Sequence, residues 1–411
     1  MRISLAILMF LASAGTVPAL AQLSVPPLGG AVGDVLGTVD RTLEPLEQTS
    51  QLTTDATKLA EQRVSRLSEL VRRNRDSIEF DNAGEPARKG ELLLLDPAHT
   101  DLMAAQDAGF TLLGRETLDE LDIGVARLGV PKGMSLVRAE QALYKLLPQA
   151  NIATDSIHLP AGGSASAGAE KSPSVMPGIA TQVGLIDGGV GPATAAGPVR
   201  GFVQGAPRAS DHGSAAASLL RSAGVRNIAA ADVYGADPTG GNALAISRAV
   251  NWLISLRVRV ICISLVGPNN PLLGQAIAAA RRRGVLVVAP VGNDGPAAPP
   301  AYPASYPGVI AVTGVDGRNR ALIEAGKALH LDYAGPGADM VAANAEGKWI
   351  RVRGTSYAAP LVAARVAATL ANDNVTSITA ALDREAIDLG RKGPDMLYGR
   401  GLLCGSCRRS K

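Results

Sequence analysis

The chain has 411 residues, enough for about two or three domains, and 46% of them are hydrophobic, so a sizeable core can be buried. Charged residues make up only 19% and the formal net charge is +3. This near balance argues against nucleic acid or an anionic membrane as a partner.

The first residues have the features of a targeting signal. Arg2 supplies a short positive region, and Ile3 to Ala14 form an apolar run too short to span a bilayer. Ala19-Leu20-Ala21 is a small-x-small cleavage site before Gln22. We therefore expect residues 1–21 to be a signal peptide and the mature protein to be secreted or periplasmic, without stable membrane insertion. An uncleaved anchor is the alternative.

Residues 22–82 are expected to form a disordered and helical N-terminal segment. Residues 22 to about 40 are rich in glycine, proline and small side chains, which predicts disorder. From Thr49 to Asn74 apolar side chains recur at helical spacing, with charged side chains on the other faces. This amphipathic helix either packs on its own protein or binds a membrane surface or a partner.

The next region, 83–160, has the element order of a ferredoxin-like α+β domain. Strands are expected at 90–96, 110–118, 121–130 and 151–159, and helices at 101–109 and 135–148. The order β-α-β-β-α-β is that of a split-βαβ unit. The apolar-poor stretch 161–178 follows and is expected to be a flexible linker that a protease can cut.

From residue 179 to 403 the pattern becomes a regular alternation of strands and helices. Strands are expected at 181–187, 227–235, 258–265, 285–292 and 309–316, and helices at 214–224, 242–257, 271–284 and 356–371. Continuous Val/Ile-rich strands alternating with helices predict a doubly wound, mostly parallel α/β sheet covered on both faces. In such sheets the chemistry lies beyond the carboxyl ends of the strands.

Four polar residues fall at that edge. Asp187 ends the strand "VGLID", His212 opens a helix in "SDHGS", Asn293 follows the strand "VLVVAPVG", and Ser356 opens a helix in "GTSYAAP". A serine hydroxyl needs a neighbouring imidazole to accept its proton, and the imidazole needs a carboxylate to fix its tautomer. The developing oxyanion needs donors, which the Asn293 amide and the backbone N–H of Ser356 can supply.

Three small residues beside these positions have expected structural tasks. Gly213 keeps space clear beside the imidazole, Gly354 lets the backbone approach closely, and Thr355 caps the helix that Ser356 opens.

Together these motifs resemble the subtilisin-like serine proteases. The matching stretches are "LIDGGV", "HGS", "GND" and "GTSYAAP", in the order Asp, His, Ser that this family uses. The resemblance covers residues 179 to 403 and implies a triad of Asp187, His212 and Ser356, with Asn293 as oxyanion donor. It also implies that the ferredoxin-like domain is a propeptide, acting as a folding aid and an intramolecular inhibitor.

The resemblance further implies which residues bind substrate. The edge Ser264, Leu265, Val266 and Gly267 should pair with an extended substrate, and Gly292 should line the pocket. Neither stretch carries charge, which favours small or apolar P1 side chains. Two residues depart from the family pattern: Ser214 stands where threonine is usual, and Val266 stands where glycine is common.

The three cysteines fit an exported protein. Cys404 and Cys407 in the C-terminal tail, 404–411, either form a local disulfide or lie in a solvated tail, and Cys262 is expected in the core. No metal ligand set and no cofactor motif is identifiable, although a structural calcium would be compatible with the family.

The sequence thus predicts a serine endopeptidase, made as a precursor, that hydrolyses protein or peptide substrates through an acyl-enzyme. Two alternatives remain. One is an esterase or acyl-transfer enzyme with the same triad, and the other is a non-catalytic binding protein whose cleft is permanently occupied by its N-terminal domain.

Overall fold

The computed structural model describes residues 46–167, 175–371 and 377–408. The residues predicted to be a signal peptide, those predicted to be disordered (22–40) and part of the predicted linker, 168–174, lie outside these residues. Within the described part of the chain, no helix is both long enough and apolar enough to cross a membrane.

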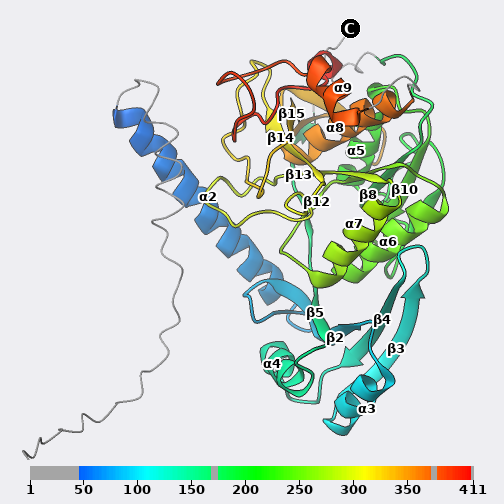
Figure 1. The fold of residues 1–411 in the computed structure, drawn as a ribbon. Helices are drawn as coiled ribbons and strands as arrows, with labels where there is room; N and C mark the ends of the chain where they lie inside the picture. Colours follow the sequence, from blue (N-terminus) through cyan, green and yellow to red (C-terminus); the bar gives the residue numbers. More distant parts are fainter. Residues whose placement is uncertain (1–45, 168–174, 372–376, 409–411) are drawn as a thin grey trace, which may run out of the picture. The chain divides into compact units, whose positions relative to one another are not determined.

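The expected amphipathic helix is present as α2, Leu46–Arg73 (Figure 1). Its last turn carries Arg72 and Arg73, where positive charge complements the partial negative charge of a helix C-terminus. Leu67 is buried, and Leu59 lies against Gly295 of the C-terminal domain. Of the two alternatives for this helix, packing on its own protein is therefore confirmed.

The ferredoxin-like domain is confirmed, with an earlier start than the sequence suggested. Its elements are β1 (Ile78–Phe80), β2 (Pro86–Leu95), α3 (His99–Asp107), β3 (Thr111–Leu118), β4 (Ile123–Gly129), α4 (Leu136–Leu146) and β5 (Asn151–Ser156). All strand pairs are antiparallel; β2 lies between β4 and β5, and β3 pairs with β4. The extra strand β1 pairs with the first residues of β2, so the boundary expected at 83 falls inside a hairpin.

Both faces of this antiparallel sheet are covered, which explains why Leu92 to Leu95 are all buried. Leu92 and Leu94 point to one face, where they pack with residues of α3 and α4. Leu93 and Leu95 point to the other face and share a core with α6 (Ala243–Ser255) and α7 (Pro271–Arg282) of the C-terminal domain. The N-terminal domain is thus docked through an apolar sheet face.

Polar contacts at the end of β5 add to this docking. The buried Asp155 accepts a hydrogen bond from the backbone N–H of Leu244 at the start of α6, at 2.9 Å. Asn270, which caps α7, donates its side-chain amide to the carbonyl of Thr154 at 2.8 Å. The N-terminal domain therefore satisfies an N–H group at the start of α6 and holds the residue that caps α7.

The predicted doubly wound sheet is confirmed. It has the order β15-β14-β13-β11-β8-β10-β9, and every neighbouring pair is parallel. The strands are β8 (Val183–Asp187), β9 (Val199–Gly201), β10 (Ile228–Asp232), β11 (Val260–Ile263), β13 (Leu286–Pro290), β14 (Ile310–Val315) and β15 (Tyr333–Pro336).

Two pairs of helices cover this sheet (Figure 1). Helices α5 (Asp211–Ser222) and α8 (Thr355–Leu370) pack on the face that includes Leu185, while α6 and α7 pack on the face that includes Ile186. Because β8 is covered on both faces, its residues are all buried, as the continuous apolar run predicts.

The stretch expected as a flexible linker is partly strand, so that prediction is wrong for its first residues. Just before the linker, β6 (Leu159–Pro160) pairs with β12 (Leu265–Val266), and within the linker β7 (Gly163–Ala167) pairs with β17 (Trp349–Arg353). The β16 strand (Met340–Ala343) completes that second sheet. The physical reason is that β-pairing uses backbone N–H and C=O groups, which a Gly/Ser-rich composition leaves available.

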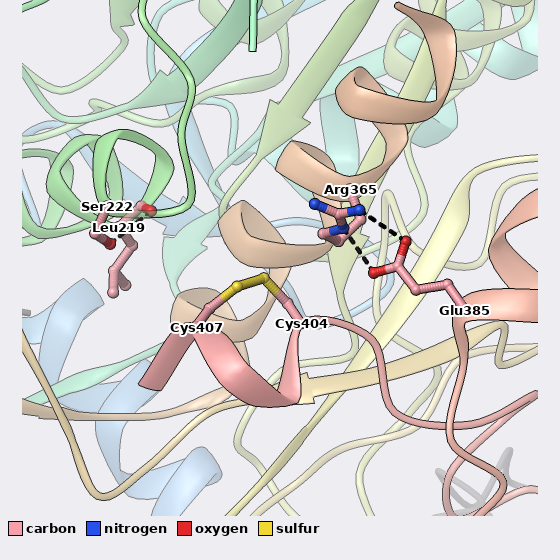
Figure 2. Close-up of a disulfide and its surroundings, with 6 residues drawn as sticks. All are labelled: Leu219, Ser222, Arg365, Glu385, Cys404 and Cys407. Atoms are coloured by element: carbon pink, nitrogen blue, oxygen red, sulfur yellow. Dashed lines mark hydrogen bonds and ion pairs between the residues drawn. A yellow bond between two sulfur atoms is a disulfide. The ribbon is translucent and has the colours of Figure 1, made fainter. Parts of the chain in front are cut away.

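The C-terminal cysteines form a disulfide, shown in Figure 2, so the solvated-tail alternative is wrong. Cys404 and Cys407 are both buried at the short helix η1 (Gly405–Arg408). In the same region Arg365 of α8 makes a two-point ion pair with Glu385 of α9 (Ile378–Glu385), at 2.6 and 3.0 Å. Cys262 is buried and free, as expected.

Candidate active site

The site begins with Asp187 at the carboxyl end of the central strand β8. Its side chain is only 1% exposed, and the N–H of Gly188 donates to its Oδ1 at 2.6 Å. Burial between neighbouring parallel strands fixes this carboxylate at the sheet edge where the sequence placed it.

His212 lies in the first turn of α5 and faces Asp187. Its Nδ1 is 2.9 and 2.8 Å from the two carboxylate oxygens of Asp187. Ser210 caps the helix by accepting from the N–H of Gly213 at 3.0 Å. The expected reason for Gly213 is corrected: a Cβ there would lie 2.0 Å from the carbonyl oxygen of Gly188, so glycine lets α5 approach the turn after Asp187.

Ser356 lies in the first turn of α8. Its Oγ is 2.9 Å from Nε2 of His212, so Asp187, His212 and Ser356 form one connected chain of side chains. The preceding Gly354 has φ 141°, and a Cβ there would lie 2.6 Å from Nδ2 of Asn293. The close approach expected at Gly354 is therefore confirmed.

Thr355 has a different task from the helix cap that the sequence suggested. Its hydroxyl donates to the carbonyl of Gly292 at 3.0 Å, and its backbone N–H donates to Oδ1 of Asn293 at 3.0 Å. Thr355 thereby fixes Oδ1 of Asn293 as an acceptor and leaves Nδ2 as the donor on the side of the cleft.

A peptide carbonyl of the chain itself occupies the space between the oxyanion donors. The carbonyl oxygen of Ala161 accepts from the backbone N–H of Ser356 at 3.1 Å and from Nδ2 of Asn293 at 2.5 Å. The next residue, Gly162, lies so close that a Cβ on it would be 2.5 Å from Oγ of Ser356. An intact peptide bond, Ala161–Gly162, therefore lies at the serine.

The residues before Ala161 extend along the predicted substrate edge. Leu159 and Pro160 pair antiparallel with Val266 and Leu265. On the other side, the N–H of His158 donates to the carbonyl of Gly241 at 2.8 Å. The chain's own segment thus lies as an added strand between two edges.

The other predicted substrate-binding residues are placed differently. Ser264 is fully buried, and its hydroxyl donates to the carbonyl of Ser356 at 2.6 Å, so it supports the start of α8. Gly267 exchanges two backbone hydrogen bonds with Tyr302, and Gly292 lies in the wall of the same cleft as Val266. Backbone contact with the occupying strand is made by Leu265 and Val266.

Three residues at the site were not predicted from the sequence. Tyr234 donates its hydroxyl to the carbonyl of His158 at 2.7 Å, and Gly241 pairs with the same residue. Tyr357 also lies beside the site, with its ring centroid 5.2 Å from that of His212. Burial raises the pKa of Tyr357, so this phenol stays neutral there. Nothing in their local sequence signals these contacts.

The arrangement can perform acyl transfer without a bound group. A hydroxyl, an imidazole and a carboxylate are connected in series, and two donors converge on a carbonyl oxygen beside the hydroxyl. Within the part of the chain that the structure describes, no three His, Cys, Asp or Glu side chains gather as a metal site would require.

A triad of this geometry at the carboxyl edge of a doubly wound parallel sheet is the arrangement that α/β serine hydrolases use. The model of the subtilase family matches residues 204–401. A subtilisin from Bacillus pumilus is 30% identical over 196 residues, which cover 46% of this chain and 71% of that protein. The chain belongs to the subtilase family.

Two further comparisons agree. Subtilisin E from Bacillus subtilis is 31% identical over 46% of this chain and 51% of its own length, so the chain spans about half of that relative. The crystal structure of fervidolysin from Fervidobacterium pennivorans, a keratinolytic enzyme related to subtilisin, has a TM-score of 0.63. It covers 81% of this chain and 63% of that one, and at 16% identity it is similar in fold alone.

Proposed function

We propose that this chain is a serine endopeptidase whose first substrate is its own Ala161–Gly162 bond. The observation that carries the proposal is the position of the Ala161 carbonyl oxygen, which accepts hydrogen bonds from Ser356 N–H and from Asn293 Nδ2. That is the geometry a peptidase needs for its substrate carbonyl, because the donors gain strength as the oxygen becomes negative.

The proposed reaction follows from the connected side chains. Nε2 of His212 accepts the Ser356 hydroxyl proton while Oγ attacks the carbonyl carbon of Ala161. Asp187 holds the ring through Nδ1 and stabilises its cation. His212 then donates the proton to the amine of Gly162, which leaves, and Ala161 remains esterified to Ser356. Water, activated by the same imidazole, hydrolyses this ester.

The docked N-terminal domain would act as an intramolecular inhibitor. Leu159 and Pro160 occupy the edge that an extended substrate would use, and Ser356 is fully buried beneath the occupying chain. A protein substrate can reach the serine only after this segment leaves. The same contacts support a folding role, because the apolar sheet face covers α6 and α7.

The cleft favours a small side chain before the bond that is cut. Ala161 occupies that position and is 3% exposed. The cleft includes the small or apolar residues Val266, Gly292, Ala298 and Ala301, and its charged lining comes from Arg63, Arg66, Glu85 and Asp294. We infer protein or peptide substrates with small or apolar P1 residues, bound by strand addition at Leu265 and Val266.

Export is part of the proposal. The signal-like residues 1–21 support it, and so does the Cys404–Cys407 disulfide, which is typical of oxidising compartments.

The deciding experiment compares wild type with Ser356→Ala and with Ser255→Ala, an exposed serine on α6. Wild type and Ser255→Ala should accumulate a fragment that begins at Gly162 by intact mass, and should react with a fluorophosphonate probe. Ser356→Ala should do neither.

The two alternatives give other outcomes. Ester hydrolysis without peptide hydrolysis would favour the esterase. Absence of both probe labelling and cleavage in wild type would favour the non-catalytic binding protein. Cleavage of purified Ser356→Ala at the same bond would exclude self-cleavage.

A further inference from the structure

An ion-pair cluster joins α2 to the loop that carries the oxyanion amide. Nε of Arg63 is 3.2 Å from Asp294, and Nη2 of Arg66 is 2.5 Å from the same carboxylate. Nη2 of the same Arg63 guanidinium donates to both carboxylate oxygens of Glu85, at 2.8 and 2.9 Å. Asp294 directly follows Asn293, so the cluster reaches the residue next to the oxyanion donor.

The cluster is partly shielded from water. The side chains of Arg63, Glu85 and Asp294 are 19%, 14% and 22% exposed, whereas Arg66 is 55% exposed. Shielding strengthens such pairs relative to fully exposed ones, which contribute little.

An apolar contact lies beside the ion pairs. A Cβ on Gly295, which has φ +79°, would lie 3.0 Å from Leu59 of α2, so the helix lies directly on this loop. The cleft between them has a volume of about 540 Å³ and is lined by Arg63, Arg66 and Leu67 as well as by Gly292 and Asn293. Helix α2 therefore forms one wall of the cleft.

We propose that the Asp294–Gly295 face is a docking surface for α2. This α2 contact keeps the N-terminal part bound to the enzyme after the Ala161–Gly162 bond is cut. The inference rests on the proposed function. Cutting after Ala161 releases only the strand end in the cleft. It leaves α2 continuous with the ferredoxin-like domain, because both precede the cut. The arginine pairs on Asp294 then oppose dissociation.

The α2 contact is tested first in the uncut Ser356→Ala chain, where catalysis plays no part. Arg66→Glu places a carboxylate beside Asp294, and Asp294→Asn removes the charge that Arg63 and Arg66 share. The matched control is Arg73→Glu on the same helix, since Arg73 pairs with the exposed Glu69. We expect hydrogen exchange of 59–67 and 291–298 to be at least about fivefold faster in both test variants than in the control.

The second arm uses the active chain. Intact mass measures cleavage of the Ala161–Gly162 bond, and hydrolysis of a chromogenic peptide measures release of the N-terminal part. Arg66→Glu should shorten the delay between cleavage and hydrolysis at least about fivefold, and NaCl should shorten it in wild type. If hydrogen exchange in Arg66→Glu and Asp294→Asn equals that in Arg73→Glu, the proposal is overturned, whether or not the active chain cleaves itself. If hydrogen exchange is faster in these two variants than in the control but the active chain shows no cleavage, the α2 contact is supported and only the proposed function is contradicted.

Discussion

The carbonyl oxygen of Ala161 accepts a hydrogen bond from the backbone N–H of Ser356, at 3.1 Å. Since Nε2 of His212 lies 2.9 Å from the serine hydroxyl, the carbonyl carbon is presented to a nucleophile that already has a base. Under the proposed function, this relationship would make the N-terminal segment both the first substrate of the enzyme and its inhibitor.

Removing the oxyanion amide should slow self-cleavage without abolishing it. Asn293→Ala is expected to lower kcat by about 10²–10³-fold, the loss known for the equivalent donor in a subtilisin, whereas Ser356→Ala should lower it by about 10⁶-fold. The rate of appearance of the fragment beginning at Gly162 measures both.

Asn293→Asp separates the two contacts of this side chain. It keeps an oxygen that can accept from Thr355 N–H but has no amide N–H for Ala161. If it cleaved as fast as wild type, the assignment of Asn293 as a donor would be wrong.

A side chain at position 162 should prevent the Ala161–Gly162 bond from lying in its place beside Ser356. A Cβ on Gly162 would lie 2.5 Å from Oγ of Ser356 and 2.7 Å from the ring of Tyr357, so Gly162→Val must displace the bond. Displacement of about 1 Å can cost about 10² in rate, and we expect cleavage after Ala161 to slow at least that much. Gly114→Val is the matched control, because a Cβ at Gly114 meets nothing within 4 Å. Equal cleavage in both variants would contradict the position of this bond.

The triad was predictable from sequence because each member has a local signature. Asp187 ends an apolar strand, and His212 and Ser356 open helices, so motif and element type agree at each position. The α/β sheet was predictable for the same reason: its strands are continuous apolar runs. Strand β15, with a glycine and a proline among its four residues, has no such run.

The occupied cleft could not be predicted in this way. Pairing of Leu159 and Pro160 with β12 uses backbone groups that every residue carries, so no side-chain pattern reports it. The contact between Arg66 and Asp294 joins residues 228 positions apart, and either charge alone reads as a solvated surface group.

The disulfide should add modestly to stability. Cys404 and Cys407 are only 3 positions apart, and closing so short a loop removes little entropy from the unfolded chain. Replacing both by serine is expected to lower the free energy of unfolding by about 2 kcal/mol, measured by urea denaturation of the Ser356→Ala chain. The control is Cys262→Ser alone, a buried thiol outside the disulfide. No change on removing the disulfide would mean that the bond does not form in the folded protein.

Two buried groups of the N-terminal domain should give stability opposite dependences on pH. Burial lowers the pKa of His158 to about 4, because removing the ring from water disfavours its charged form. The contribution of neutral His158 to the free energy of unfolding is complete above the pKa of histidine in the unfolded chain, near 6.5. It is lost as the pH falls toward 4. Burial raises the pKa of Asp155 to about 6, although Leu244 N–H and Arg88 oppose this. The cost of keeping Asp155 charged is therefore relieved as the pH falls below 6.

The free energies of unfolding of His158→Leu and Asp155→Asn, each in the Ser356→Ala chain, measure the two effects at pH 7 and pH 5. On acidification His158→Leu should lose about 2 kcal/mol less stability than the parent, since one pH unit corresponds to about 1.4 kcal/mol below pH 6.5. Asp155→Asn should lose about 1 kcal/mol more than the parent, because the parent gains by protonating Asp155 between pH 6 and 5. All other carboxylates are common to the three chains and cancel in the comparison. Differences of the same sign in both variants would show that at least one of these side chains is not buried as the structure has it.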